Sequence, residues 1–104
     1  MGLGFSTQAQ ADSLFVNWLP SRVDCPSACG KTGLKFAIPT GIDHKTGKPS
    51  FFICATRRER GGEWHSGFNT WGKNTCTTAF GNEVYNGEKY SCLCTNNPRM
   101  RPFK

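Results

Sequence analysis

Two histidines are the groups in this chain best suited to acid–base chemistry. His44 and His65 each lie in a polar or aromatic-flanked segment, and Lys45 or Lys73 could supply a neighbouring cation. Such a set could perform the proton transfers of a ribonuclease, and the formal net charge of +6 would attract RNA. Because two histidines occur in most chains of this size, surface or structural roles explain them more simply than catalysis does.

The motifs of other enzyme classes are absent from the sequence. There is no Gly-x-Ser-x-Gly elbow, no phosphate-binding loop and no metal-binding histidine pair. The seven Asp and Glu residues form no pair whose context suggests glycosidase chemistry. We therefore expect a protein that is not an enzyme and has no catalytic residues, cofactor or metal.

Between residues 64 and 74, aromatic rings alternate with small and polar residues. The segment holds Trp64, Phe68 and Trp71, with His65, Asn69 and Asn74 nearby. This mixture suits a sugar site, where an aromatic face covers C–H groups while amides or charges bind hydroxyls. It would also suit stacking of single-stranded bases. Packing of the rings in a small core is the structural alternative.

The bulk composition predicts a small, cross-linked domain. With 104 residues, 37% hydrophobic content and 12 glycines, the chain has room for one modest core and a large backbone entropy to overcome. Six cysteines in so short a chain are typical of a disulfide framework, which forms in an oxidising compartment. A zinc site is the alternative, but the sequence has no C-x-x-C pair. We therefore expect a secreted or periplasmic protein.

The positive charge favours an acidic partner. Nucleic acid, anionic lipid, an acidic glycan and an acidic protein face are all candidates, and solubility alone would also explain the charge. In the expected compartment we favour a carbohydrate or an acidic protein surface, with docking into a larger complex as a further option and nucleic acid less favoured. No apolar run approaches the roughly 20 residues that span a bilayer, so no transmembrane segment is expected.

The chain is expected to form one domain. Residues 1–13 contain little that could pack, and Ala9-Gln10-Ala11 is similar to the end of a signal peptide. We interpret 1–13 as a disordered remnant of a processing segment or of cloning. Residues 14–104 then form a single disulfide-rich domain with a basic tail.

Short apolar runs separated by turn residues predict a mainly β fold, a small antiparallel β domain. Strands are expected at 14–19, ended by Pro20, at 34–38, stopped by Pro39, and at 50–56, 76–80 and 90–95. Residues 41–49 read as a polar hairpin, 57–62 as a basic turn and 64–71 as irregular. Gly81-Asn82 and Asn86-Gly87 are expected to be turns.

One short helix is expected near residues 25–29. Asp24 is a good N-cap, Pro26 suits the first turn, and Gly30 could end the helix in a left-handed conformation. In a helix, Cys25 and Cys29 share one face and lie about 6 Å apart along the axis.

The cysteine spacings predict a disulfide-stapled helix. In a strand, Cys92 and Cys94 share one face about 6.8 Å apart, which nearly matches the spacing of the helical pair. Two parallel bridges could therefore join helix and strand, leaving Cys54 to pair with Cys76 on neighbouring strands. Which of Cys92 and Cys94 bonds Cys25 depends on the helix direction, and both pairings stay open.

About half of the chain has the motif order of a known family. The pattern runs through Gly47-Lys48-Pro49-Ser50-Phe51-Phe52-Ile53-Cys54-Ala55, His65-Ser66-Gly67, Cys76-Thr77-Thr78-Ala79-Phe80-Gly81-Asn82-Glu83 and Tyr90. Residues 41–94 thereby resemble a single divergent copy of the DM-nine repeat domain. The resemblance implies a compact antiparallel β fold and a lectin-like function, since some members bind mannose.

The ligand contacts implied by this resemblance are altered in the present chain. The position of the family's binding lysine falls on Phe68, and that of its acidic partner falls on Thr46, with Asp43 the nearest carboxylate. For a sugar ligand, the candidate contacts are therefore Asp43, His65, Asn69, Trp71 and Lys73.

Three functions follow, in order of preference. The first is a secreted or periplasmic non-enzymatic binding module with lectin-like recognition of a carbohydrate or cell-surface ligand. The second is an accessory subunit that docks onto a larger exported assembly. The third is a small basic ribonuclease-like toxin.

Overall fold

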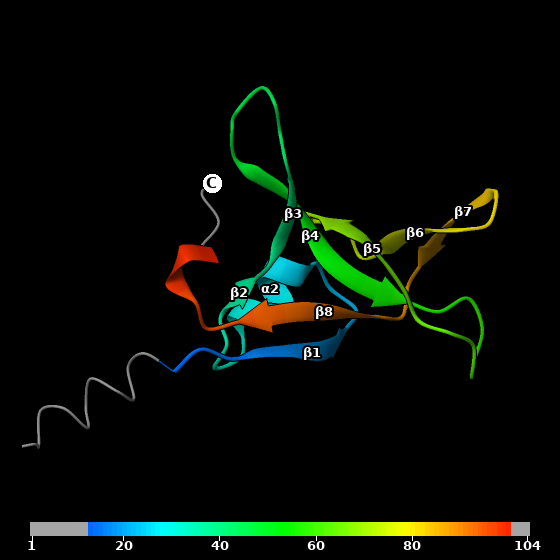
Figure 1. The fold of residues 1–104 in the computed structure, drawn as a ribbon, viewed down its shortest axis with the longest axis horizontal. Helices are drawn as coiled ribbons and strands as arrows, with labels where there is room; N and C mark the ends of the chain where they lie inside the picture. The colour runs from blue at the N-terminus through cyan, green and yellow to red at the C-terminus, as the bar shows by residue number, and fades with distance from the viewer. Residues whose placement is uncertain (1–12, 101–104) are drawn as a thin grey trace, which may run out of the picture.

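The computed structural model describes residues 13–100, which form one eight-stranded antiparallel sheet with a short α-helix on it (Figure 1). The elements are β1 (Val16–Ser21), α2 (Cys25–Gly30), β2 (Phe36–Ala37), β3 (Pro39–Ile42), β4 (Pro49–Thr56), β5 (His65–Thr70), β6 (Cys76–Phe80), β7 (Glu83–Gly87), β8 (Tyr90–Thr95) and the 3₁₀ turn η1 (Pro98–Met100). The predicted fold class is thus confirmed. Residues 1–12 of the expected remnant, and residues 101–104 of the basic tail, lie outside the described residues.

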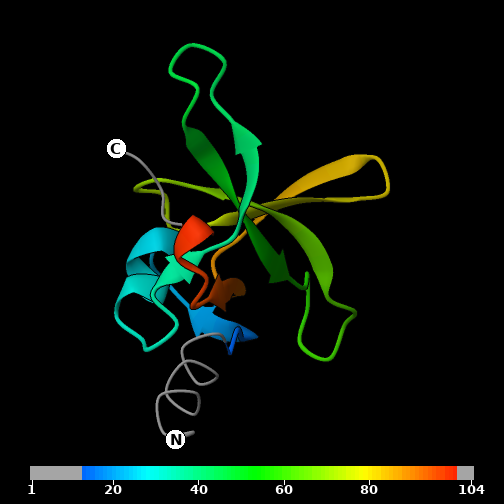
Figure 2. The same cartoon turned by 60° about the vertical axis from the view of Figure 1, so that its left-hand side comes forward.

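The sheet is strongly twisted. Its strand order is β1-β8-β4-β5-β6-β7, with β2 added beside β8 and β3 beside β4. Figure 2 shows the β3–β4 turn, the β4–β5 loop and the β6–β7 hairpin projecting in three different directions. At the right-hand side of Figure 1, β1 and β4 end where β8 begins. Strand ends from distant parts of the sequence therefore lie close together at this end of the sheet.

The helix forms for the local reasons that the sequence predicts. The Asp24 carboxylate accepts a hydrogen bond from the Ser27 backbone N–H at 3.3 Å, and Pro26 stands in the first turn. The prediction that Gly30 ends the helix in a left-handed conformation is wrong. The helix is instead followed by Lys31 at φ −88°, whose N–H donates to Ala28 O.

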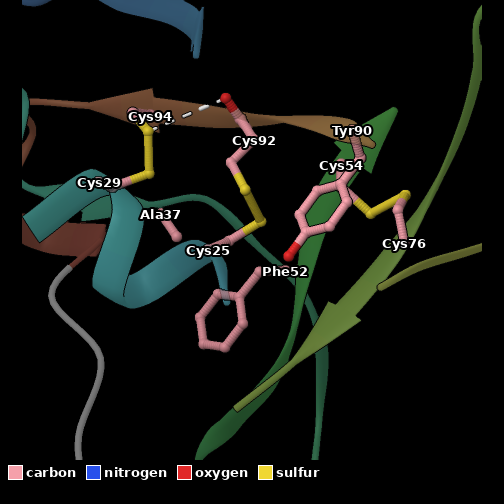
Figure 3. Packing of buried hydrophobic residues seen from close by; sticks show 9 residues of the cluster. All are labelled: Cys25, Cys29, Ala37, Phe52, Cys54, Cys76, Tyr90, Cys92 and Cys94. Carbon is pink, nitrogen blue, oxygen red and sulfur yellow. Dashed lines mark hydrogen bonds between the residues drawn. A yellow bond between two sulfur atoms is a disulfide. The ribbon is translucent and has the colours of Figure 1, made fainter. Parts of the chain in front are cut away.

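Two parallel disulfides fix this helix to β8. Cys25 bonds Cys92 and Cys29 bonds Cys94, each with the Cα atoms 5.5 Å apart. Of the two pairings that the spacing allowed, this is the one present. Figure 3 shows both bridges between the helix and the strand.

The third disulfide, Cys54–Cys76, joins strands that do not hydrogen-bond to each other. β4 and β6 flank β5 in the strand order, yet the two Cα atoms are 6.0 Å apart. Gly67 on β5 permits the close approach of β6, since a Cβ there would lie 2.1 Å from Thr77 O. The expectation that these two cysteines sit on adjacent strands is therefore wrong.

The core is built largely from sulfur. All six half-cystines have no exposed surface, and they pack with Ala37, Phe52 and Tyr90 (Figure 3). With so few large apolar side chains buried, the cross-links carry much of the stabilisation.

Two prolines do not end strands as predicted. Pro20 lies within β1, paired with Ser91, and it is tolerated because β1 is an edge strand that needs no outward donor. On the same edge, the Trp18 N–H donates a hydrogen bond to the side-chain Oδ1 of the preceding residue, Asn17. Pro39 begins β3, while Lys35 at φ 70° shortens the strand expected at 34–38 to two residues.

Two strands appear where the sequence predicts other structure. The segment expected to be irregular contains β5, which lies between β4 and β6 and pairs with both. The expected Asn86-Gly87 turn is the end of β7. Gly87 is buried there and packs so closely on Thr56 that a Cβ would lie 2.2 Å from Thr56 Oγ1.

Candidate functional site

Asn69, predicted to contact ligand, is a structural residue. Its side chain is 1% exposed. Its Oδ1 accepts from the Cys25 N–H at 2.8 Å, and its Nδ2 donates to Lys73 O at 2.9 Å and Thr75 O at 2.8 Å. The prediction that this amide contacts a ligand is therefore wrong, because it is buried and hydrogen-bonded to backbone.

Three other predicted contacts lie at one end of the sheet. Trp71 is half-buried, packs edge-to-face on Phe52 at 5.4 Å and donates from Nε1 to Pro49 O at 3.3 Å. Asp43 shapes the β3–β4 turn, its Oδ1 accepting from the Lys45 N–H at 2.8 Å. Lys73 is exposed in the turn after β5. Trp71 thus belongs to the core and Asp43 to a turn.

His65 lies at the opposite end of the same strand. It pairs with Thr56 at the end of β4, whereas Thr70 pairs with Phe51 near its start. His65 and Thr70 are five residue steps apart along the strand, a distance of roughly 17 Å. The five predicted contacts therefore do not form one site.

The two histidines are also far apart. His44 lies in the β3–β4 turn, before β4 begins, and His65 is opposite the last residue of β4. The length of that strand, roughly 24 Å, separates them. His65 instead packs against Phe80, with ring centroids 4.3 Å apart. The structure therefore does not bring together the histidine pair that a ribonuclease would need.

A different site is found at the end of the sheet where His65 lies. A cleft of about 1040 Å³ opens there, next to the β4–β5 loop. Its lining contains five cations and two carboxylates, a surplus of three positive charges: Arg22, Arg57, Arg58, Arg60 and Lys89, with Glu59 and Glu88. We name it the basic cleft.

Sheet register builds the basic cleft from distant segments. Ser21 pairs with Tyr90, Tyr90 with Thr56, and Thr56 with His65, so that one row of residues crosses four strands. The next residues outward on those strands are Arg22, Lys89, Arg57 and Trp64, and all four line the cleft. The sequence signal for the site was a basic turn at 57–62 beside an aromatic segment, but Arg22 precedes that turn by 35 residues and Lys89 follows it by 27.

Arg57 and Trp64 form a stacked pair. The guanidinium carbon lies 4.8 Å from the centroid of the indole, and Trp64 is 52% exposed. Stacking holds the planar guanidinium while leaving its edge N–H groups able to bind a carboxylate or sulfate in two-point fashion.

Arg58 stands apart from the other cations of the cleft. Its Nη2 lies 2.7 Å from Glu83 Oε1, and its guanidinium lies 5.9 Å from the Phe80 ring. This is the only ion pair among residues 13–100, so the remaining cations of the cleft keep their charge uncompensated at short range.

Tyr90 and Thr56 anchor the cleft to the core. The Tyr90 hydroxyl donates to Val23 O at 2.5 Å, and Thr56 Oγ1 donates to Lys89 O at 2.8 Å. Burial of the phenol, reinforced by the negative charge of Asp24, raises the pKa of Tyr90 from 10.0 to about 12. The tyrosine is therefore a neutral hydrogen-bond donor beneath the cations.

Other kinds of site find no support within residues 13–100. No group of three His, Cys, Asp or Glu side chains there could hold a metal ion, and the helices described are too short to cross a membrane. All six cysteines are paired, which fits an oxidising compartment.

Comparison with known proteins adds no family. The chain matches no family model, no curated protein and no solved structure. The resemblance to the DM-nine repeat domain therefore remains a prediction from the sequence motifs.

Proposed function

We propose that this protein is an exported, non-enzymatic binding module that recognises an acidic carbohydrate through the basic cleft. The observation that carries the proposal is the Arg57–Trp64 pair, an oriented guanidinium beside an exposed indole in a cleft with surplus positive charge.

This pair suits the two kinds of surface on an acidic sugar. The face of a sugar ring presents C–H groups that pack on an aromatic ring, as Trp64 offers. A carboxylate or sulfate on that ring accepts charge-assisted hydrogen bonds, which Arg57 can donate in a planar fork. A neutral sugar such as mannose would leave the cations unpaired. We therefore place the proposed lectin-like site at the basic cleft, and no longer at the residues that the family resemblance implied.

The disulfides support export. Three bridges in a chain of 104 residues are characteristic of proteins that fold outside the cytosol. We assign the protein to the secreted or periplasmic space, where acidic glycans of surfaces and matrices are accessible ligands.

A glycan array that contains neutral, uronate-bearing and sulfated sugars tests this function. We expect binding to the acidic sugars, competition by the same sugars in free form, and loss of binding in Arg57→Ala. The matched control is Lys45→Ala at the other end of the sheet, which should bind as the wild type does. Absence of binding to every acidic glycan would refute the proposed function.

A second function, that of a subunit in a larger exported assembly, is favoured by one exposed apolar segment of the chain. Leu14, Phe15, Val16 and Trp18 are 44–61% exposed at and before β1, an arrangement typical of surfaces that are covered by a protein partner. Native purification tests this function. Elution as a free monomer would contradict it, whereas co-elution with a partner that is lost in Trp18→Ser would support it.

A further inference from the structure

The basic cleft has a direction that follows from the register of the sheet. Arg22, Lys89, Arg57 and Trp64 succeed one another across β1, β8, β4 and β5, one residue beyond the paired row. Neighbouring strands are about 4.8 Å apart, so the four residues extend over roughly 14 Å. The row therefore consists of three cations side by side, followed by one aromatic ring.

These side chains line one cleft just beyond the strand ends. Thr56 and Tyr90 in the paired row are buried, with 0% and 3% exposure. Arg57 directly follows β4 and is half-buried, whereas Lys89 directly precedes β8 and is exposed. All four members of the row line the cleft, so a ligand that crosses the strands would meet each of them in turn.

The lining offers one ring but several charges. Tyr90 is buried, and Tyr85 is half-buried with its ring packed edge-to-face on Phe80 at 5.4 Å. Trp64 is thus the ring of the lining that is well exposed. Single-stranded nucleic acid binds through successive stacked bases, and a row with one platform does not provide them.

We infer that the basic cleft binds a linear acidic oligosaccharide lying across the strands. Three successive sulfate or carboxylate groups contact Arg22, Lys89 and Arg57, and one sugar ring packs on Trp64. This inference rests on the proposed function. It adds the number of anionic groups that the cleft binds and the direction in which the oligosaccharide lies.

Salt dependence of binding measures the number of charges. Neutralising each anionic group releases counterions, so the slope of log K against log salt scales with the number of contacts. We expect affinity for size-defined acidic oligosaccharides to rise up to three anionic groups and then to level off. Parallel series of sulfated and uronate-bearing oligosaccharides show which anionic group the row prefers.

The variants then separate charge from stacking. Arg22→Gln, Lys89→Gln and Arg57→Gln should each reduce the magnitude of the slope, by up to about one. Arg57→Lys should keep the slope while weakening binding, because it keeps the charge and loses the planar fork. Trp64→Ala should weaken binding roughly three- to tenfold with the slope unchanged. Lys45→Gln and Lys48→Gln, in the β3–β4 turn, are the matched controls.

The outcomes distinguish this inference from the function on which it rests. If wild-type protein binds acidic glycans and Arg57→Ala loses binding, but Arg22→Gln and Lys89→Gln have the slope of Lys45→Gln, the row is refuted while the binding function stands. Tighter binding of a single-stranded polynucleotide of equal charge would also overturn the inference. Absence of glycan binding in the wild type would overturn both.

Discussion

The side-chain oxygen of Asn69 accepts a hydrogen bond from the backbone N–H of Cys25, 44 residues earlier in the chain. The same amide donates to two carbonyls of the β5–β6 turn. One buried side chain therefore joins the start of the helix to the far end of β5.

Replacement of Asn69 should destabilise the fold strongly. Asn69→Ala would leave the buried Cys25 N–H without a partner, at a cost of about 1–3 kcal/mol, and would also remove the hydrogen bonds to the part-buried carbonyls of Lys73 and Thr75. We expect a loss of roughly 3 kcal/mol or more in urea unfolding. The control is Asn74→Ala in the exposed turn, which should change stability little. Equal stabilities of the two variants would contradict the structural role.

Removal of a disulfide should destabilise the fold according to the loop that this bridge alone closes. The Cys54–Cys76 bridge closes 22 residues and the Cys25–Cys92 bridge closes 67. Chain entropy assigns roughly 3 kcal/mol to the Cys54–Cys76 bridge and less than that to Cys25–Cys92, because Cys29–Cys94 still closes nearly the same long loop when Cys25–Cys92 is removed. Thermal unfolding of the Cys54→Ala/Cys76→Ala and Cys25→Ala/Cys92→Ala proteins measures both, and full reduction should unfold the chain. Thermal stability that is unchanged in reductant would refute the cross-linked core.

Gly67 should tolerate no side chain. In Gly67→Ala the new Cβ would lie 2.1 Å from Thr77 O, a backbone atom, so β6 must move. We expect destabilisation by at least about 2 kcal/mol, measured by denaturant unfolding. In Gly33→Ala the Cβ meets nothing within 4 Å, and that variant should be neutral or slightly stabilised.

Tyr90 should make stability fall at alkaline pH. Its pKa is raised from 10.0 to about 12 by burial and by Asp24. The native state therefore holds the phenolic proton more tightly than the unfolded state, and this contribution is fully present below pH 10. It is lost as pH rises from 10 to 12, by roughly 2–3 kcal/mol.

Unfolding by urea across this pH range checks the prediction. Tyr90→Phe should be less stable at pH 8, because it loses the hydrogen bond to Val23 O, and should show a shallower decline above pH 10. Identical pH profiles for wild type and variant would show that the phenol does not contribute.

The helix and its cross-links were predictable because their signals are local. Asp24 and Pro26 mark the start of the helix, and the four-residue spacing of Cys25 and Cys29 matches the two-residue spacing of Cys92 and Cys94. By contrast, β5 depends on pairing with β4 and β6, and Gly67 acts through an atom ten residues away. The sequence next to β5 and Gly67 does not indicate which distant residues they contact.

The site was predictable only in part. The basic turn at 57–62 and Trp64 were visible, but Arg22 and Lys89 join them through antiparallel register. Asn69 was misinterpreted because an amide among aromatic residues has the same sequence signature in a sugar site and in a core. Burial, which only the packed sheet determines, separates the two cases.

The outer edge of β1 is poor in hydrogen-bond donors, since the Trp18 N–H is already bonded to Asn17 and Pro20 has none. A foreign strand therefore finds an incomplete template there, which disfavours extension of the ladder. A protein that covers Leu14, Phe15 and Val16 would then bind mainly through side-chain packing and the shape of the contact.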